Sequence, residues 1–447
     1  MRIIEAGEFD AYWKNLNGSV NSNTADTVDA IVREIIAAVR AEGDGALRRY
    51  AAKFDKSSPE RLEVDRSIAE DAWKKLKAGD PELARALELA AGHINRFSLE
   101  QKRQFQDFEY EMEDGLITGQ RVIPVERAAI YVPGGRFPLI STVLMGLIPA
   151  AAAGVEELLV ASPPGVDGLP DARILAAAAL AGTVGGHFPR IFAMGGAQAI
   201  AALALGTQTV PRSDLIAGPG NKYVAAAKRI LYGEVGIDFI AGPTDVLIIA
   251  EPGAAELASA AELASADILA QAEHDPDARA RVLVPASGAG DTFAGEIRVA
   301  LERQIAKLST GAVARASLDA GGLIIKYRDR EDGISIANTI APEHLELQVS
   351  NPQEWIPGLK NYGSLFIGSN AAEVLGDYSA GINHTLPTNG SARFTGGLSV
   401  RHFLKTVTTL RCAFGPGFEE ARWAAECIAQ AEGLSGHGAS AAARKRR

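Results

Sequence analysis

Apolar residues follow a helical spacing in the first quarter of the chain and a strand–helix alternation after it. Between Thr27 and about Phe105, stretches such as 30–40 and 81–96 place their apolar residues on one stripe of a helix. From about residue 121, short β-rich runs alternate with alanine-rich runs of helical spacing. The expected strands are 128–132, 157–161, 190–194 and 214–217, and the expected helices are 171–181 and 197–205. This alternation predicts βαβ units around a buried parallel sheet.

A second series of the same kind follows the turn-rich segment Ala241-Gly-Pro-Thr244, which is a candidate hinge. Its expected strands are 245–250, 281–284 and 322–327, and its expected helices cover about 254–273 and 291–307. After about Arg401 the pattern again indicates helix, with a C-terminal helix over 419–431. We therefore predict an α/β fold of two tandem, incomplete Rossmann-like domains with helical N-terminal and C-terminal extensions.

Charge and composition narrow the possible partners. The 447 residues carry a formal net charge of −10, so most of the surface should repel nucleic acid and anionic membranes. No apolar run approaches the ~18 residues of a membrane span, and the acidic N-terminus does not resemble a secretory signal. The two cysteines, Cys412 and Cys427, cannot form a disulfide framework, and we expect both to be packing residues. These features predict a cytoplasmic protein that acts on a small molecule.

Three short segments in the second half carry most of the candidate chemistry. They are Gln271-Ala-Glu-His274, Glu343-His344 and the segment 377–384. Three of the seven histidines lie in these segments beside carboxylates or amides, and His437 follows Glu432 by five residues. Imidazole, carboxylate and amide oxygen can together bind a divalent metal, and a separate Glu-His pair can act as an acid/base couple.

Each segment also has a simpler interpretation. Gln271 and His274 lie three residues apart at a helix end, where such a pair can bind one ion or merely cap the helix. With Asp377 and His437 they would complete a set of four nitrogen and oxygen ligands that suits Zn²⁺. The Glu343-His344 pair is either an acid/base couple at a loop-to-strand junction or a solvated acid beside a structural histidine. The loop residue His384 is a candidate ligand-binding residue.

Glycine-rich turns follow three of the expected strands, at 133–135, 194–196 and 217–220. Backbone N–H groups in such turns can hold a dinucleotide phosphate. No turn completes Gly-x-Gly-x-x-Gly, so the standard Rossmann fingerprint is absent. Three such turns in one unit nevertheless favour a binding cleft at the strand ends.

Taken together, these motifs resemble those of the histidinol dehydrogenase family, from about residue 120 to His437. The matching segments are 131–145, 195–201 (Gly-Gly-Ala-Gln-Ala-Ile-Ala), 218–221 (Gly-Pro-Gly-Asn), 271–274, 342–346 (Pro-Glu-His-Leu-Glu) and 383–387 (Asn-His-Thr-Leu-Pro). The resemblance implies a zinc-dependent, NAD-linked four-electron dehydrogenase. Its reaction would be the oxidation of L-histidinol through L-histidinaldehyde to L-histidine, the last steps of histidine biosynthesis.

The resemblance also implies a role for each site residue. The zinc ligands would be Gln271, His274, Asp377 and His437, with His437 contributed across a homodimer interface. Glu343 and His344 would be the acid/base residues. The NAD contacts would be Tyr131, Gln198 and Asn221. Thr244, His384 and Glu432 would contact the substrate, together with His344 and the four metal ligands.

We divide the chain into four parts on this basis. They are an N-terminal arm (1–22), a domain with the metal and acid/base residues (23–130 plus 244–398), a Rossmann-like domain with the NAD contacts (131–243) and a helical dimerisation segment (399–447).

Three positions depart from the usual family pattern: Thr244 replaces a serine, Asp275 a glycine, and Phe137 a small residue. They leave open two alternatives. One is a paralogue that oxidises another polar alcohol, such as a sulfonated diol, and the other is a non-catalytic metal- or nucleotide-binding relative. Pro342 and the Pro-Gly-Gly turn favour the histidinol interpretation over the sulfonate one. The intact Glu343-His344 pair disfavours the non-catalytic one.

Overall fold

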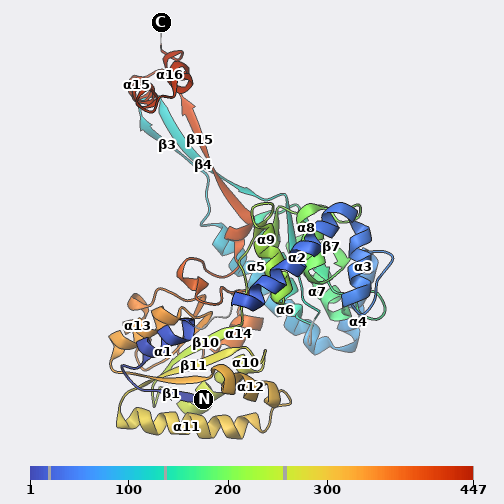
Figure 1. The fold of residues 1–447 in the computed structure, drawn as a ribbon, viewed down its shortest axis with the longest axis vertical. Helices are drawn as coiled ribbons and strands as arrows, with labels where there is room; N and C mark the ends of the chain where they lie inside the picture. Colours follow the sequence, from blue (N-terminus) through green and yellow to red (C-terminus); the bar gives the residue numbers. More distant parts are fainter. Residues whose placement is uncertain (19–21, 135–137, 255–258, 446–447) are drawn as a thin grey trace.

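Two α/β bodies and a projecting arm make up the protein (Figure 1). The computed structural model describes residues 1–447 except 19–21, 135–137, 255–258 and 446–447. Gly135 and Phe137, both noted in the sequence, therefore lie outside the described residues. Each body is built on a six-stranded sheet, and the arm contains a three-stranded sheet. The predicted α/β class with parallel sheets is confirmed.

The first body surrounds a sheet in the order β2-β7-β6-β5-β8-β9, parallel except for β2. Its strands are β2 (Glu63–Val64), β5 (Arg127–Tyr131), β6 (Glu157–Ser162), β7 (Arg190–Ala193), β8 (Leu215–Ala217) and β9 (Gly236–Ile237). Side chains alternate along β5: Ala128 and Ile130 join one apolar core, whereas Ala129 and Tyr131 join the core on the opposite face. Helices therefore have to cover both faces.

Among the described residues, helices cover both faces of the first sheet. One face packs against α4 (Arg66–Gly79), α5 (Pro81–Lys102), α6 (Ile140–Ala153) and α7 (Ala172–Gly185). The other face packs against α2 (Ser22–Glu42), α3 (Asp44–Phe54), α8 (Gly196–Leu205) and α9 (Lys222–Leu231). The structure thus differs from the predicted division, which placed 23–130 with 244–398. The apolar stripes of α2 to α5 are buried on the first sheet, and local periodicity does not reveal which sheet a stripe will face.

The second body contains a fully parallel sheet in the order β1-β12-β11-β10-β13-β14. Its strands are β1 (Arg2–Ile4), β10 (Asp245–Ala250), β11 (Arg279–Pro285), β12 (Leu323–Tyr327), β13 (His344–Gln348) and β14 (Ser364–Ile367). Its helices are α1 (Phe9–Gly18), α10 (Ala260–Ala272), α11 (Gly288–Ile305), α12 (Gly311–Gly321), α13 (Arg330–Ile340) and α14 (Glu373–Tyr378). The predicted N-terminal arm is part of this body, because β1 pairs with β12 and Phe9 is buried in its core.

An antiparallel sheet forms the arm that projects from the two bodies in Figure 1. It consists of β3 (Phe108–Glu113), β4 (Leu116–Pro124) and β15 (Leu404–Cys412), in the order β15-β4-β3. The helices α15 (Pro416–Ala431) and α16 (Ser435–Ala442) lie at its tip. The expectation of helix from about Arg401 is wrong for β15, which pairs along its whole length with β4. Cys412 and Cys427 are exposed, so they are not the packing residues we expected.

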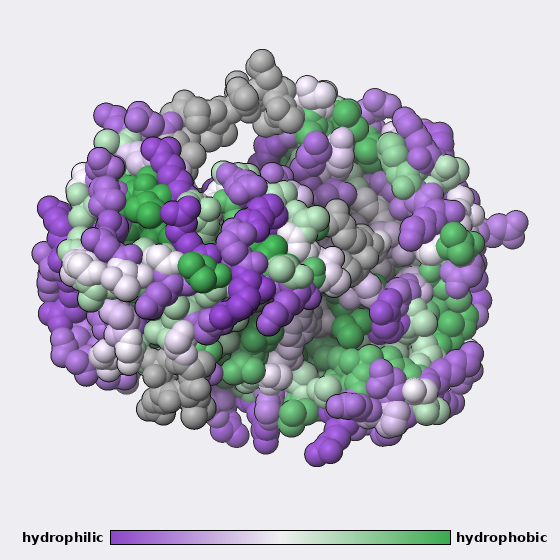
Figure 2. Space-filling model, turned by 90° about the horizontal axis from the view of Figure 1, so that it is seen from below, coloured by the Kyte–Doolittle hydropathy of each residue, from purple (hydrophilic) through white to green (hydrophobic). Residues whose placement is uncertain are grey.

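Hydrophilic residues cover much of the face seen from below, with smaller hydrophobic patches between them (Figure 2). Such a mixture is ordinary for the surface of a globular protein. Among the described residues, no helix combines the length and the apolar character needed to cross a membrane.

Candidate active site

A cavity of about 180 Å³ lies where the two α/β bodies meet. The first body contributes the start of α6 and the loop after β8, and the second contributes the segments that precede or begin β10 and β13. The polar residues lining it include Ser141, Thr142, Asp238, Thr244, His274, Glu343, His344, Asp377 and His384. The sequence segments chosen for their chemistry are therefore brought together from distant parts of the chain.

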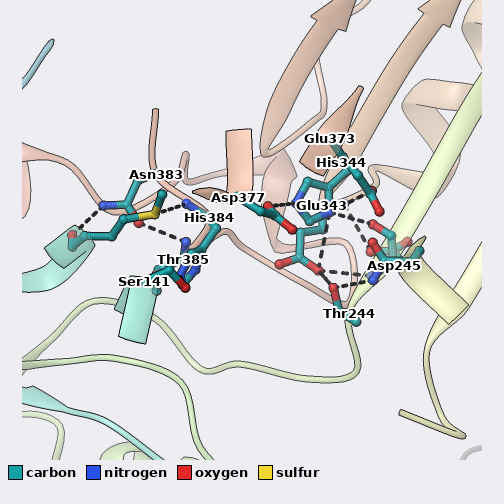
Figure 3. Close-up of polar contacts among 12 residues, drawn as sticks. Ser141, Thr244, Asp245, Glu343, His344, Glu373, Asp377, Asn383, His384 and Thr385 are labelled. Carbon is teal, nitrogen blue, oxygen red and sulfur yellow. Dashed lines mark hydrogen bonds and ion pairs between the residues drawn. The ribbon is translucent and has the colours of Figure 1, made fainter. Parts of the chain in front are cut away.

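Glu343 is almost fully buried, with 5% of its surface exposed. Its Oε2 accepts hydrogen bonds from the Thr244 hydroxyl and from the N–H of Asp245 at 3.0 Å (Figure 3). Thr244 Oγ1 in turn accepts a hydrogen bond of 2.6 Å from Gln271 Nε2. Burial raises the pKa of Glu343 to about 7, against the opposing effects of His344 and Thr244. A carboxyl group with this pKa can take up or release a proton near neutral pH.

His344 lies among three carboxylates and is itself buried (Figure 3). Its Nε2 is 3.4 Å from Asp377 Oδ1, and its Nδ1 is 3.7 Å from Glu373 Oε2 and 4.0 Å from Glu343 Oε2. Burial opposes charge on the ring, but Glu343, Asp377 and Glu373 together raise the pKa of His344 well above its usual value.

The orientation of the His344 ring determines which nitrogen can act as a base. Nδ1 lies 3.3 Å from the carbonyl oxygen of Asp245, to which it can donate a hydrogen bond. In the neutral ring, Nε2 is then the proton acceptor. Nε2 is buried and makes no hydrogen bond with any described residue, and Asp377 Oδ1 lies 3.4 Å from it. Only this neutral form has the geometry of a general base that acts through Nε2, and the three carboxylates favour the protonated form.

The strand β13 explains why so many polar groups collect here. His344, Glu346 and Gln348 alternate with Leu345 and Leu347, whose side chains enter an apolar core. The polar face packs against α10 and α14. Gln348 Nε2 donates to Asp267 Oδ2 at 2.7 Å and to Glu346 Oε2 at 2.9 Å, and the N–H of Glu373 donates to Glu346 Oε1 at 2.8 Å.

Burial and mutual repulsion favour the protonated forms of these acids. The pKa of Glu346 is raised well above its usual value by burial and then by Asp267 and Glu373. Burial likewise raises the pKa of Glu373 to about 8. Both carboxylate oxygens of Glu373 lack a hydrogen-bond partner within the described residues. A protonated Glu373 therefore has a proton that it can direct toward a neighbour.

Three of the four predicted metal ligands gather beside this cavity. His274 and Asp377 line it, and Gln271 is joined to it through Thr244. Burial alone would raise the pKa of Asp377, but His344 and then His384 and His274 lower it, which keeps an anionic oxygen among the histidines. Asp377 Oδ1 is buried and makes no hydrogen bond with any described residue. These donors suit a divalent ion. Because the side-chain nitrogen of Gln271 donates to Thr244, its side-chain amide oxygen is the atom that would bind the ion.

The fourth predicted ligand lies elsewhere in the chain. His437 is on α16 and Glu432 follows α15, both exposed at the tip of the arm and away from the cavity (Figure 1). Within the described part of the chain, no three His, Cys, Asp or Glu side chains are arranged to hold a metal ion. One chain therefore does not assemble the predicted four-ligand set.

His384 faces the first body from the loop after α14. Its Nε2 is 3.1 Å from Ser141 Oγ and its N–H donates to Met145 Sδ (Figure 3). Burial lowers the pKa of His384, so the ring is neutral near pH 7. A neutral imidazole between the two bodies can donate or accept a hydrogen bond with a polar substrate.

A much larger cavity, of about 1170 Å³, lies at the carboxyl ends of the first sheet. Tyr131, Gln198 and Asn221, the predicted NAD contacts, all line it. The Tyr131 hydroxyl accepts a hydrogen bond from the N–H of Gly196, and Asn221 caps α9 through the N–H groups of Tyr223 and Val224. Gly218 has φ +113°, and a Cβ there would lie 2.2 Å from the carbonyl oxygen of Tyr131. Only glycine permits this close turn between the two cavities.

Sequence reasoning missed two residues that contact the Glu343-His344 pair. Asp245 accepts from the N–H of Glu343 at 3.1 Å and from the buried Arg281 at 3.0 Å. Its position directly after Thr244, at the start of a strand, was an available signal. Glu373 lies beside His344, and its spacing of four residues from Asp377 places both on one helix face.

Comparison with known proteins gives a consistent result. The histidinol dehydrogenase family model matches residues 19–445. A histidinol dehydrogenase of Thermus thermophilus is 45% identical over 414 residues, covering 93% of this chain and 94% of that protein. One of Aquifex aeolicus is 42% identical over 416 residues, covering 93% and 92%. The crystal structure of histidinol dehydrogenase from Elizabethkingia anophelis matches with a TM-score of 0.88 and 32% identity, covering 99% of this chain and 98% of that one.

The two-sheet fold, the large cleft and the buried Glu343-His344 pair, taken with these matches, define an α/β oxidoreductase. More specifically, the chain belongs to the histidinol dehydrogenase family.

Proposed function

We propose that this protein is a zinc-dependent, NAD-linked four-electron dehydrogenase that oxidises L-histidinol through L-histidinaldehyde to L-histidine. The observation that carries the proposal is the buried Glu343-His344 pair, held in a cavity between two Rossmann-like bodies in a member of this family. Relatives named histidinol dehydrogenase align over nearly the whole chain at 40–45% identity, which favours L-histidinol over the other polar alcohols considered.

Two residues would carry the proton transfers. His344 Nε2, fixed by the contact of Nδ1 with Asp245, accepts the hydroxyl proton as the alcohol carbon gives up its hydride. Glu343, whose pKa of about 7 suits a general base, takes a proton from water as that water adds to the aldehyde. The hydrate then has a new hydroxyl and can lose a second hydride. NAD, when bound, supplies the hydride acceptor for both steps.

The cleft of the first body is the proposed NAD site. Its size is ample for a dinucleotide, and it lies at the strand ends where doubly wound sheets bind nucleotides. Tyr131, Gln198 and Asn221 provide hydroxyl and amide groups along it. Gly218 and Pro219 line the cavity with Glu343 and His344, and Asn221 on the same loop lines the cleft, so a ligand spanning both would follow this loop.

Zinc is the proposed metal, and Gln271, His274 and Asp377 are its proposed ligands from one chain. Asp377 Oδ1, which is buried and has no hydrogen-bond partner among the described residues, and the nearby His274 fit a borderline ion of this kind. When bound, zinc would orient the substrate and, by engaging Asp377, would remove one of the carboxylates that raise the pKa of His344.

His437 is the proposed fourth ligand, supplied with Glu432 by the second chain of a homodimer. The arm extends away from its own active site, so its tip can reach only another molecule (Figure 1). The arm also exposes large apolar side chains, including Phe108, Tyr110, Met112, Leu410, Trp423 and Ile428. Apolar exposure on this scale is typical of a surface that is covered in an assembly.

A substrate panel tests the proposed function. Steady-state NADH formation is measured with L-histidinol and with other polar alcohols, including a sulfonated diol, before and after chelation. We expect turnover with L-histidinol, weaker turnover with the others, and loss of activity on chelation. A clear preference for another alcohol, or full activity in metal-free protein, would contradict the proposal.

A further inference from the structure

The nucleotide-sized cleft of the first body contains a carboxyl group that the proposed reaction does not use. Asp55 follows the last turn of α3 and lines the cleft together with Tyr131 and Gln198. Its carboxylate lies close to Gly195, which follows β7 and packs against Pro163, which follows β6. A Cβ on Gly195 would lie 2.6 Å from Pro163 Cγ and 3.0 Å from Asp55 Oδ1, so the missing side chain makes room for the carboxylate.

Asp55 is poorly supplied with hydrogen-bond donors for a partly buried carboxylate. Among the described residues, only Gln198 Nε2 donates to its side chain, at a long distance of 3.5 Å. No described cation forms an ion pair with it. Burial raises the pKa of Asp55 to about 6, as expected for a desolvated acid without strong partners. The carboxylate therefore has unused acceptor positions that face the cleft.

Asp171, another acid lining the same cleft, provides a contrast. Its carboxylate accepts hydrogen bonds from Arg173 Nε at 3.0 Å and Nη2 at 2.9 Å, and it also caps α7 through the N–H of Arg173. The hydrogen bonds from Arg173 lower the pKa of Asp171. The protein itself thus supplies hydrogen-bond donors to Asp171, whereas Asp55 can still accept hydrogen bonds from a ligand.

The sheet order indicates which part of a dinucleotide would reach Asp55. The acid/base cavity borders the first sheet at Gly218 and Pro219, directly after β8. Asp55 lies at the ends of β6 and β7, and β5 and β6 separate β7 from β8. At about 4.8 Å per strand, β7 and β8 are about 14 Å apart. A dinucleotide with its nicotinamide ring at the acid/base cavity would thus place its other end, the adenosine, over β6 and β7.

We propose that Asp55 accepts hydrogen bonds from the hydroxyl groups of the adenosine ribose and thereby selects NAD over NADP. This inference rests on the proposed use of a nicotinamide dinucleotide. A ribose diol offers two O–H donors to one carboxylate, whereas a 2′-phosphate would bring a second anion against it. Gln198, which is buried and lines the same cleft, contacts the carboxylate through Nε2 at 3.5 Å.

Calorimetric titration of the full-length protein with NAD and with NADP tests the inference without relying on turnover. The wild-type protein should bind NAD at least about tenfold more tightly than NADP. Asp55→Asn should bind NAD about tenfold more weakly, as expected for the loss of charged hydrogen-bond acceptors, and should lose most of the preference. Asp80→Asn is the matched control: Asp80 caps α5 through the N–H of Leu83 and is not among the residues that line the cleft, and asparagine also caps a helix, so this variant should bind NAD like the wild type.

The possible results separate this inference from the proposed function. If the wild type binds neither dinucleotide, the proposed cofactor is wrong and the inference fails with it. If the wild type binds NAD and Asp55→Asn binds it equally well, only the inference is overturned. Equal binding of NADP and NAD by the wild type would also overturn it. Circular dichroism and the thermal midpoint establish that each variant is folded.

Discussion

Replacement of Thr244 by valine should weaken both the fold and the second oxidation step. The Thr244 hydroxyl donates to Glu343 Oε2 and accepts from Gln271 Nε2, so it links the proposed water-activating acid to a proposed metal ligand. Valine has nearly the same shape but neither hydrogen-bonding function. The variant leaves the Gln271 amide without its acceptor and leaves Glu343 with one donor fewer. At about 1–3 kcal/mol for the unsatisfied Gln271 amide and about 1 kcal/mol for the hydrogen bond that Glu343 loses, we expect the free energy of unfolding to fall by about 2–4 kcal/mol.

The catalytic effect of Thr244→Val follows from the same hydrogen bond. The bond lowers the pKa of Glu343, so its loss should raise this pKa above its present value of about 7. At pH 7 a larger fraction of Glu343 would then be protonated and unable to accept a proton from water. Aldehyde oxidation should therefore slow at pH 7 and recover partly as the pH rises.

Urea denaturation and single-turnover NADH formation from L-histidinaldehyde between pH 6 and 9 are the assays. Thr244→Ser keeps the hydroxyl and loses only a methyl group, so it should retain the wild-type pH profile and most of the stability. The reasoning is refuted if valine and serine variants behave alike in both assays. It is also refuted if the valine variant slows equally at every pH.

Three further results are expected. In single-turnover assays, Glu343→Gln should slow aldehyde oxidation more than alcohol oxidation, by about 10²–10⁴-fold, whereas His344→Asn should impair both; equal slowing of both steps by Glu343→Gln would contradict this division of roles. In the folded protein, burial raises the pKa of Glu346 well above its usual value of 4.5, so Glu346 keeps a proton that the unfolded chain loses. The free energy of unfolding therefore falls as the pH rises past that value. Urea denaturation at pH 5 and pH 8 should show a smaller fall in unfolding free energy for Glu346→Gln than for the wild type. An equal fall in both proteins would argue against this role of Glu346. Mixing inactive His437→Ala and His344→Ala chains should restore some activity, because one mixed site has both residues; no recovery despite subunit exchange would place each site within one chain.

Much of the fold was predictable because its signals are local. The strands β5, β6, β7, β8, β10, β11 and β12 all lie where β-rich runs occur between helical stretches. The strand β15 could not be predicted from the sequence, because its residues are mostly exposed and its partner β4 lies almost 300 residues earlier. The pairing of these two strands leaves no periodic pattern in either segment.

The candidate site shows the same division between local and distant signals. Glu343, His344 and Thr244 were selected from their segments, and the parallel pairing of β10 with β13 brings them together. Glu373 was overlooked because an acid in the segment Ala-Ala-Glu-Val-Leu looks like a solvated surface residue. Its burial depends on how α14 packs on β13. The distance of His437 from the cavity also depends on the arm, which the sequence pattern did not indicate.

The stoichiometry of the overall reaction tests the proposed function most directly. Metal-loaded protein is incubated with a limiting amount of L-histidinol and excess NAD, and NADH and L-histidine are quantified at completion. We predict two NADH and one L-histidine for each L-histidinol consumed, because the same site would carry out both hydride transfers. One NADH with accumulation of the aldehyde, or no NADH from L-histidinol, would contradict the proposed four-electron oxidation.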